Sequence, residues 1–388
     1  MRRNRKYWLR RCVPAAILVA LINGHGWAAT HDQGLSGSVD DRSWLREGTV
    51  TSRGDVVTYD FDGTNQTFTV ERDPAAYFGA DPRKVIVNNA GGTLYLTGTN
   101  STPNDFMGGR ALAIEDGGNV TINSDLNLSA SGDYVASGIS VSRGGSGEGI
   151  ETHLVINGNV TMRKNDPSNP WAGVTNNIHG NYDSYPSFGA SNYTGARWAP
   201  QAIRLAEQDG STITINGDLD IAWKGTGIAT DAYNTRLNPY DEDIITTNGN
   251  VRVETPVSNT ETYYSLANYG GTINLNATKD QAETHDVTLL GNIITIRNPG
   301  GTNGGDPYFY QSGRTNIGLT TGKSMWEGVI DNAGKSRAGE VNVWLENGAV
   351  WDHHSRSVTD GMQVANMPNP SKDHYGKYNA VSYVRLLS

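Results

Sequence analysis

The side chains in this sequence that could do chemistry are mainly recognition groups. Arg53, Gly54 and Asp55 form the tripeptide that integrins bind, and they stand directly before the strand-like run Val56–Tyr59. A chain rich in Gly and Asp can contain this tripeptide by chance, so it is a hypothesis for adhesion and no more.

A second group of recognition residues lies between residues 164 and 200. This stretch carries Trp171, Tyr182, Tyr185, Tyr193 and Trp198 among Asn, Gly, Ser and Pro. Long insertions of this kind are often functional, and aromatic rings beside polar groups can stack on sugars or bind a host protein. The alternative is that the insertion packs its own aromatic rings against the flank of the domain, and the sequence leaves both open.

Residue patterns for catalysis and metal binding are weak. Ser142 lacks the glycine two residues earlier that a nucleophile elbow needs, and adjacent His353 and His354 would point to opposite faces of a strand. Gly144–Gly149 lacks the aspartate of a glycine-rich calcium repeat, and the acidic run 241–243 is typical of a solvated loop. The sequence therefore predicts no catalytic residues, no cofactor and no metal.

Charge and cysteine content exclude further classes of function. Of 388 residues, 40 are acidic and 31 are basic, giving a net charge of −9. This balance argues against a nucleic-acid partner, which needs a basic surface. The single cysteine, Cys12, excludes a disulfide framework and a cysteine-based metal cluster.

Residues 1–28 have the pattern of a secretory signal peptide. Six basic residues and no acid precede a short apolar run, Val13–Ile22, and Gly26 and Ala28 are the small residues expected before a cleavage site. The run is too short to cross a bilayer easily, although an uncleaved membrane anchor is the alternative. We expect export across the inner membrane, with the mature protein at the cell surface, in the outer membrane or secreted.

A repeated strand–turn–strand unit organises the rest of the chain. Four segments contain Asn followed by a small or polar pair: 123–125, 157–159, 216–218 and 248–250. Counting from the Asn, positions −3, −1, +3 and +5 are apolar in nearly every copy, so two short strands should point the same face inward. A weaker fifth copy is expected from Val287 through Gly291 to Thr295.

A third strand precedes several of these units. Short apolar stretches begin at Ala111, Gly138, Ala202, Gly227 and Ser265. A three-strand unit repeating about every 25 residues cannot bury its face alone and must stack on its neighbours. The pattern predicts an all-β fold, a parallel β-helix, with a propeller as the second choice because its blades are longer and antiparallel.

The Asn and Gly at each turn are interpreted as structural. Both residues tolerate positive φ, which a sharp turn would require, and aligned Asn side chains can form hydrogen-bonded stacks. Calcium or ligand binding at these turns is the alternative.

The ends of the repeat region should differ from its middle. Residues 56–61 and 66–70 flank the turn-rich stretch 62–65, which predicts a hairpin that caps the first coil. We therefore divide the chain into a signal peptide (1–28), an N-terminal segment with the capping hairpin (29–84) and a β-helix (85–388) with its insertion at 164–200. The edge near residues 383–387 is expected to be open.

Two downstream motifs, Met325-Trp-Glu-Gly328 and Val341-Asn-Val-Trp-Leu-Glu-Asn-Gly-Ala-Val-Trp351, together with the repeats, resemble autotransporter passenger domains of Gram-negative bacteria. The resemblance covers residues 85 to 388 and implies a right-handed parallel β-helix carried to the cell surface by an outer-membrane β-barrel translocator. The sequence departs from the family because nothing after Trp351 could supply that barrel, so we expect an incomplete passenger or a separate barrel partner.

The leading expectation is a non-enzymatic adhesin that presents loops to a host surface protein or glycan. The alternative is a β-helical polysaccharide lyase or glycosidase, which would need acidic and basic side chains clustered on successive coils at one height. A purely structural spacer is the third possibility.

Overall fold

The protein was analysed as a computed structural model. The structure describes residues 29–31, 35–36, 49–71, 74–79, 84–99, 109–115, 117–130, 137–142, 151–164, 200–206, 210–231, 242–257, 264–268, 270–277, 285–295, 301–303, 306–308, 312–331, 339–353, 356 and 385–386. The predicted signal peptide lies outside these residues. Within them the chain forms strands and no helix, and so no helix with the length and hydropathy to cross a bilayer.

The strands form three parallel ladders, which we call ladders I, II and III. Ladder I contains β4 (Val56–Asp60), the first part of β7 (Lys84–Thr99), the first part of β9 (Asn119–Ala130), β11 (His153–Ile156), β14 (Thr212–Ile215), β17 (Ile244–Thr247), β20 (Thr272–Leu275), β25 (Arg314–Leu319), β28 (Glu340–Leu345) and β30 (Arg385–Leu386). Ladder II contains β1 (Ala29–His31), β5 (Gln66–Glu71), the second parts of β7 and β9, β12 (Val160–Lys164), β15 (Leu219–Trp223), β18 (Val251–Glu254), β21 (Val287–Leu290), β26 (Met325–Glu327) and β29 (Val350–Asp352). Ladder III contains β2 (Leu35–Ser36), β6 (Ala76–Phe78), β8 (Arg110–Glu115), β10 (Ser137–Ser142), β13 (Gln201–Ala206), β16 (Thr226–Asp231), β19 (Tyr264–Asn268), β22 (Asn292–Thr295) and β27 (Ile330–Asp331).

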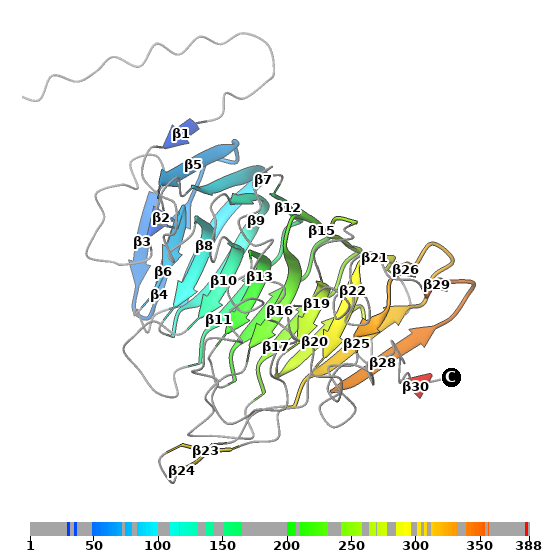
Figure 1. Ribbon diagram of the computed structural model, residues 1–388. Coiled ribbons are helices and arrows are strands. Elements are labelled where there is room, and N and C mark those ends of the chain that lie inside the picture. Colours follow the sequence, from blue (N-terminus) through cyan, green and yellow to red (C-terminus); the bar gives the residue numbers. More distant parts are fainter. Residues whose placement is uncertain are drawn as a thin grey trace, which may run out of the picture.

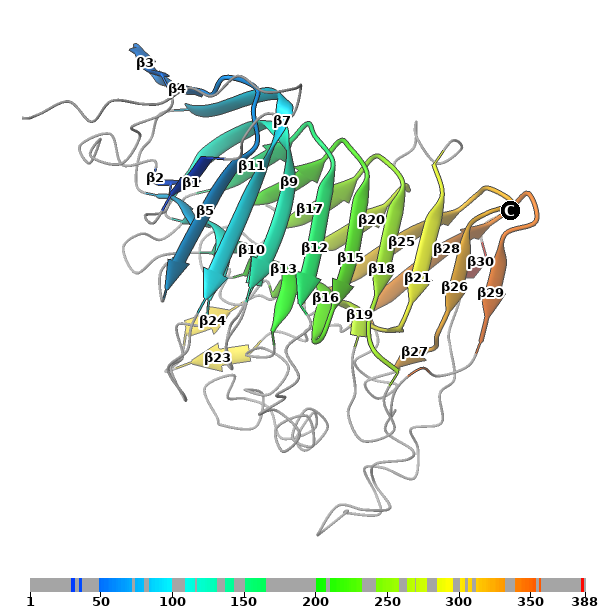
Figure 2. The same cartoon turned by 90° about the horizontal axis from the view of Figure 1, so that it is seen from above.

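The chain visits the ladders in a fixed order, from I to II to III and back to I, and each strand pairs with its counterparts one circuit earlier and later. We call one circuit a coil. Figure 1 shows the coils succeeding one another along the stack, and Figure 2 shows the ladder II strands lying side by side. The short antiparallel pair β23 (Gly301–Asn303) and β24 (Asp306–Tyr308) stands apart from the three ladders.

The core fills the space enclosed by the ladders. The positions predicted to point inward are all buried, with 0–2% of each residue exposed: Val120, Ile122, Leu154, Ile156, Ile213, Ile215, Val251 and Val253. Each such burial contributes about 1.5–3 kcal/mol relative to exposure. The third strand of the repeat is also confirmed, because Leu112, Ile139, Ile203, Ile228 and Leu266 are consecutive partners in ladder III.

The hairpin predicted around residues 62–65 is wrong. β4 pairs in parallel with β7 in ladder I, and β5 pairs in parallel with β7 in ladder II, so the two strands do not pair with each other. Residues 61–65 form a corner between two ladders, and the repeat begins before residue 85. The hairpin at this end is instead β3 (Thr49–Arg53) with β4, and β3 closes the edge of ladder I in the antiparallel sense.

The predicted fifth copy has the wrong phase. Val287 is buried and belongs to ladder II, where it pairs with Val251, and Gly291 turns the chain from ladder II into ladder III. The Asn-Gly turns lie between ladders I and II. An apolar alternation around a glycine therefore does not distinguish one corner of the coil from another.

The Asn-Gly corners are held by a stack of amide side chains, as predicted. The Nδ2 group of each Asn donates a hydrogen bond of 2.7 Å to the side-chain oxygen of the residue one coil earlier. The series runs from Asn248 through Asn216, Asn157, Asn123 and Asn88 to Asp60. We call this series the amide stack. It locks the register of six successive strands of ladder I.

The reason expected for the corner glycines is wrong. Gly158, Gly217 and Gly249 do not have positive φ. A Cβ on Gly217 would lie 2.3 Å from the Gly158 carbonyl oxygen, and one on Gly249 would lie 2.4 Å from that of Gly217. Glycine is required here because the stacked backbones approach too closely for a side chain.

A second polar series holds the corner between ladders III and I. The backbone N–H of Gly117 donates to Thr152 Oγ1 (3.1 Å), that of Thr152 to Ser211 Oγ (2.9 Å) and that of Ser211 to Asp243 Oδ1 (2.9 Å). Asp243 is fully buried, so the prediction of a solvated acidic run at 241–243 is wrong for this residue. Its side chain is one of the corner acceptors.

The links between the ladders differ in length from one corner of the coil to another. Most links between ladders I and II are short, such as 157–159, 216–218 and 248–250. Two long links, 165–200 and 296–313, both adjoin ladder III. Ladder III strands such as β10, β19 and β22 are buried on both faces, whereas ladder II strands such as β12 alternate.

Candidate functional site: a hairpin tip and a charged column

The tripeptide Arg53-Gly54-Asp55 lies at the tip of the β3–β4 hairpin. Arg53 pairs with Val56, which leaves Gly54 and Asp55 as the two turn residues. Gly54 has a φ of 56°, and a glycine with positive φ at the first central position is typical of a type II′ turn.

All three residues of the tip are exposed, and a Cβ built on Gly54 would meet no atom within 4 Å. In the described part of the chain, neither the guanidinium of Arg53 nor the carboxylate of Asp55 makes a side-chain hydrogen bond or ion pair. The hairpin stands at the N-terminal end of the stack (Figure 2), so both charges face solvent on a narrow turn.

Five aromatic residues of the insertion are candidates for ligand binding. Trp171, Tyr182, Tyr185, Tyr193 and Trp198 all lie outside the described residues, between β12 and Pro200. Their role in ligand binding remains a prediction.

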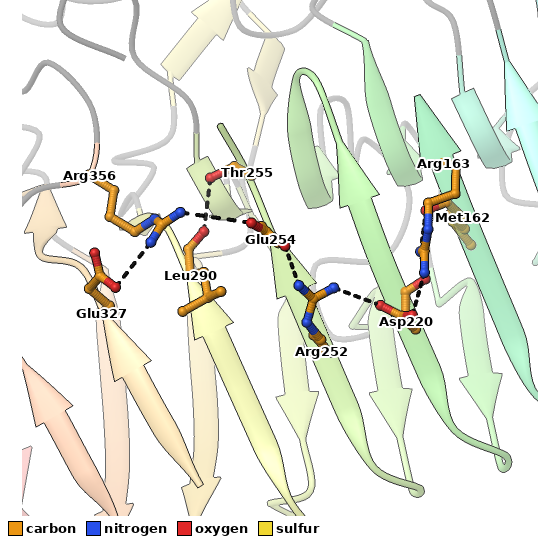
Figure 3. Close-up of polar contacts among 9 residues, drawn as sticks. All are labelled: Met162, Arg163, Asp220, Arg252, Glu254, Thr255, Leu290, Glu327 and Arg356. Atoms are coloured by element: carbon orange, nitrogen blue, oxygen red, sulfur yellow. Dashed lines mark hydrogen bonds and ion pairs between the residues drawn. The ribbon is translucent and has the colours of Figure 1, made fainter. Parts of the chain in front are cut away.

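A column of alternating charge crosses the outer face of ladder II (Figure 3). It contains Arg163, Asp220, Arg252, Glu254, Arg356 and Glu327, from four strands and one residue beyond β29. These six residues form what we call the charged column.

Each carboxylate of the column contacts a guanidinium. Asp220 accepts from Arg163 and, at 3.1 Å, from Nη1 of Arg252, whose Nη2 donates to Glu254. Arg356 lies between Glu254, at 4.0 Å, and Glu327, at 3.0 Å. Partial burial acts to lower the pKa of Arg252, but the hydrogen bond to Asp220 and the nearby negative charges outweigh it and raise that pKa.

The charged column satisfies one requirement of a β-helical enzyme, since acidic and basic groups lie on successive coils of one face. The carboxylates are nevertheless engaged with guanidinium groups, so a substrate would have to displace those contacts before a carboxylate could act on it. Side chains of Arg163, Asp220 and Arg252 are 37–42% exposed, which makes the pairs weak individually.

The charged column was not predicted from the sequence, although the sequence contains a signal for it. Counted from the repeat Asn, Arg163 and Glu254 stand at +6, and Asp220 and Arg252 stand at +4, between the inward positions +3 and +5. Outward positions on aligned coils therefore carried alternating charge. Arg356 belongs to no repeat and could not be found this way.

Two of the tryptophans quoted for the family resemblance lie on neighbouring coils. Trp326 and Trp351 stack with ring centroids 4.5 Å apart and an interplanar angle of 2°. Their indole N–H groups donate 3.0 Å to the carbonyl oxygens of Gly291 and Gly328, respectively. Because the same indole-to-carbonyl hydrogen bond repeats on successive coils, we interpret these two tryptophans as structural residues.

The remaining candidates do not assemble into a site. Ser142 ends β10, and His353 contacts the edge of Trp351 with ring centroids 5.3 Å apart. In the residues that the structure describes, no three His, Cys, Asp or Glu side chains are grouped as metal ligands would be.

Comparisons with known proteins add no assignment. Neither the family models, nor the curated proteins, nor the solved structures gave a match to this chain.

Proposed function

We propose that the stack of coils is a right-handed parallel β-helix. The support is the fixed order in which the chain visits three parallel ladders, each pairing strands one coil apart. Right-handedness follows from the rule that parallel strands joined by a crossover in the same sheet connect with that hand in almost all cases.

On this scaffold we propose a non-enzymatic adhesin, exported by its N-terminal leader and held at the cell surface by an outer-membrane translocator. The observation that supports adhesion best is the hairpin tip, where Arg53 and Asp55 are exposed on a turn that the neighbouring ladder holds in place. A guanidinium and a carboxylate separated by one glycine suit a partner that offers a carboxylate to the first and a bound divalent cation to the second. The proposed partner is therefore a host surface receptor of the integrin type.

Cell attachment to surfaces coated with the purified protein tests this proposal. We expect attachment that is lost with Asp55→Glu, because the longer side chain moves the carboxylate, and lost when divalent cations are chelated. Glu346→Asp is the matched control, since it makes the opposite one-methylene change at another exposed turn. Equal attachment to the parent and to Asp55→Glu would reject the hairpin tip as the adhesive site.

A carbohydrate-active enzyme is the second candidate, and the charged column is the observation that favours it. Asp220, between Arg163 and Arg252, is the carboxylate best placed to face a substrate on this surface. Release of reducing ends or unsaturated products from polysaccharides, abolished by Asp220→Asn with the fold intact, would support the enzyme and contradict the adhesin.

A further inference from the structure

The outer face of ladder II carries two glutamates separated by one apolar side chain. Glu254 ends β18, Leu290 ends β21 and Glu327 ends β26, and these three residues are aligned partners on consecutive strands. At about 4.8 Å per strand, the backbones of the two glutamates are about 10 Å apart. The half-buried Leu290 lies between them and offers no charge to either.

The guanidinium of Arg356 lies between the two glutamates. Its Nη1 lies 3.0 Å from Oε2 of Glu327, and its Nη2 lies 4.0 Å from Oε1 of Glu254. Only 12% of the side chain is exposed, and the backbone N–H lies 3.4 Å from Oδ1 of Asn292. Figure 3 shows the guanidinium directed at both carboxylates from the opposite side to Arg252.

We propose that Glu254 and Glu327 form a guanidinium-binding slot, and that Arg356 occupies this slot in cis as a clip between coils that are not neighbours. In a stack of repeats each unit normally contacts only the units directly before and after it. Arg356 follows β29, yet it contacts Glu254 in β18, and the ladder strands β21 and β26 lie between β18 and β29.

The clip has a consequence for how the molecule opens. Without it, the last strands of ladder II could separate one at a time from the end of the stack. With it, separation of β26 or β29 also requires loss of the Arg356 contacts to β18. The segment from β18 to β29 should therefore open as one cooperative unit.

Arginine is suited to this position because its planar guanidinium presents several donors at fixed angles and can contact two carboxylates together. A lysine ammonium is a single point charge on a flexible stem. Arg356→Lys should thus keep the charge and lose most of the bridging.

Hydrogen exchange of the full-length protein, followed by mass spectrometry of peptides covering β18, β21, β26 and β29, tests the clip. We expect Arg356→Ala to raise exchange in β26 and β29 at least tenfold, with Arg356→Lys close to Ala. Glu254→Gln should raise exchange in the same two strands, although Glu254 lies in β18. Arg314→Ala is the matched control, because Arg314 pairs with Glu340 only across adjacent strands, at 3.4 Å. It should change exchange in β26 and β29 less than twofold.

Chemical rescue distinguishes the slot from a general loss of structure. Guanidinium ion at a few millimolar, matched by sodium chloride, should restore protection in Arg356→Ala and fail in Arg356→Ala/Glu327→Gln. Exchange that rises equally in Arg356→Ala and Arg314→Ala would overturn the proposal. So would a Glu254→Gln effect confined to β18, or rescue that is indifferent to Glu327.

Discussion

The direction of hydrogen bonding in the amide stack predicts that exchanging Asn and Asp is nearly neutral at one position and costly at another. Every amide of the stack donates toward the N-terminal end, so an inner member must donate and accept, whereas the first member only accepts. Asp60 is that first member and accepts from Asn88 at 2.7 Å. Asn216 is an inner member that donates to Asn157 and accepts from Asn248, both at 2.7 Å.

The magnitudes follow from counting these bonds. Asp60→Asn keeps the acceptor and should change the free energy of unfolding by less than about 0.5 kcal/mol. Asn216→Ala removes two exposed neutral hydrogen bonds, worth about 1–2 kcal/mol together when water replaces the lost partners. Asn216→Asp loses the hydrogen bond to Asn157 and places a carboxylate oxygen next to the amide oxygen of Asn157. It should therefore lower the free energy of unfolding by about 2–3 kcal/mol.

Urea unfolding of the parent and the three variants at pH 7, with a repeat at pH 3, measures these differences. The ionised Asp introduced at position 216 is disfavoured in the folded state, so its cost should be largest at neutral pH. It should shrink as the pH falls, because a protonated carboxyl can donate to Asn157. Equal costs for Asp60→Asn and Asn216→Asp at pH 7 would refute the directional stack.

Four other perturbations test the rest of the architecture. Ile215→Asp should lower the free energy of unfolding by several kcal/mol because it buries an unpaired charge in the core, and an unchanged thermal midpoint would contradict this. Gly217→Ala should cost about 1–3 kcal/mol through the clash with the Gly158 carbonyl, again measured by thermal unfolding. Hydrogen bonds from the Thr64 hydroxyl and N–H lower the pKa of Asp62, so the stability difference between parent and Asp62→Ala should be present at neutral pH and be lost as the pH falls through this lowered pKa. β30 lies at the last position of ladder I, so deleting residues 379–388 or introducing Val384→Pro should change the oligomer distribution in light scattering, and a monomer in every case would reject an associating edge.

The sequence predicted those parts of the fold that follow from local periodicity. Strand side chains alternate with period two, so the inward positions around each repeat Asn, such as Ile213 and Ile215, could be assigned without knowing any partner. The third strand and the amide stack followed from aligning the copies, because equivalent positions in a stacked repeat must meet.

The wrong predictions concern local sequence patterns that are compatible with more than one long-range strand pairing. Asp62-Gly63-Thr64-Asn65 has the composition of a hairpin turn, but β4 and β5 pair with β7, whose residues come more than 20 positions later. Gly291 was assigned to the wrong corner for the same reason. Buried Asp243 looked like part of a solvated run, because its partner, the N–H of Ser211, lies 32 residues earlier in the chain.

The candidate site was predicted less well than the fold. The exposed tripeptide was identified from three letters, but its place on a hairpin tip depended on β3, which the sequence analysis did not recognise as a strand. The charged column was not predicted because its members occupy outward positions, which apolar periodicity does not define, and because Arg356 lies outside the repeat.

The connections between ladders differ in how much change in length they can accept. The Asn-Gly corners stack backbone on backbone, so inserting even one residue there would disrupt the close backbone contact and the amide hydrogen bonds of that coil. A connection that adjoins ladder III, such as 165–200, enters and leaves through strands already fixed by their neighbours, and doubling its length would cost only about 0.6 kcal/mol in closure entropy. Such connections are thus natural sites for exchanging one surface peptide for another, by drift in a population or by grafting in the laboratory, while the same rigid stack presents it.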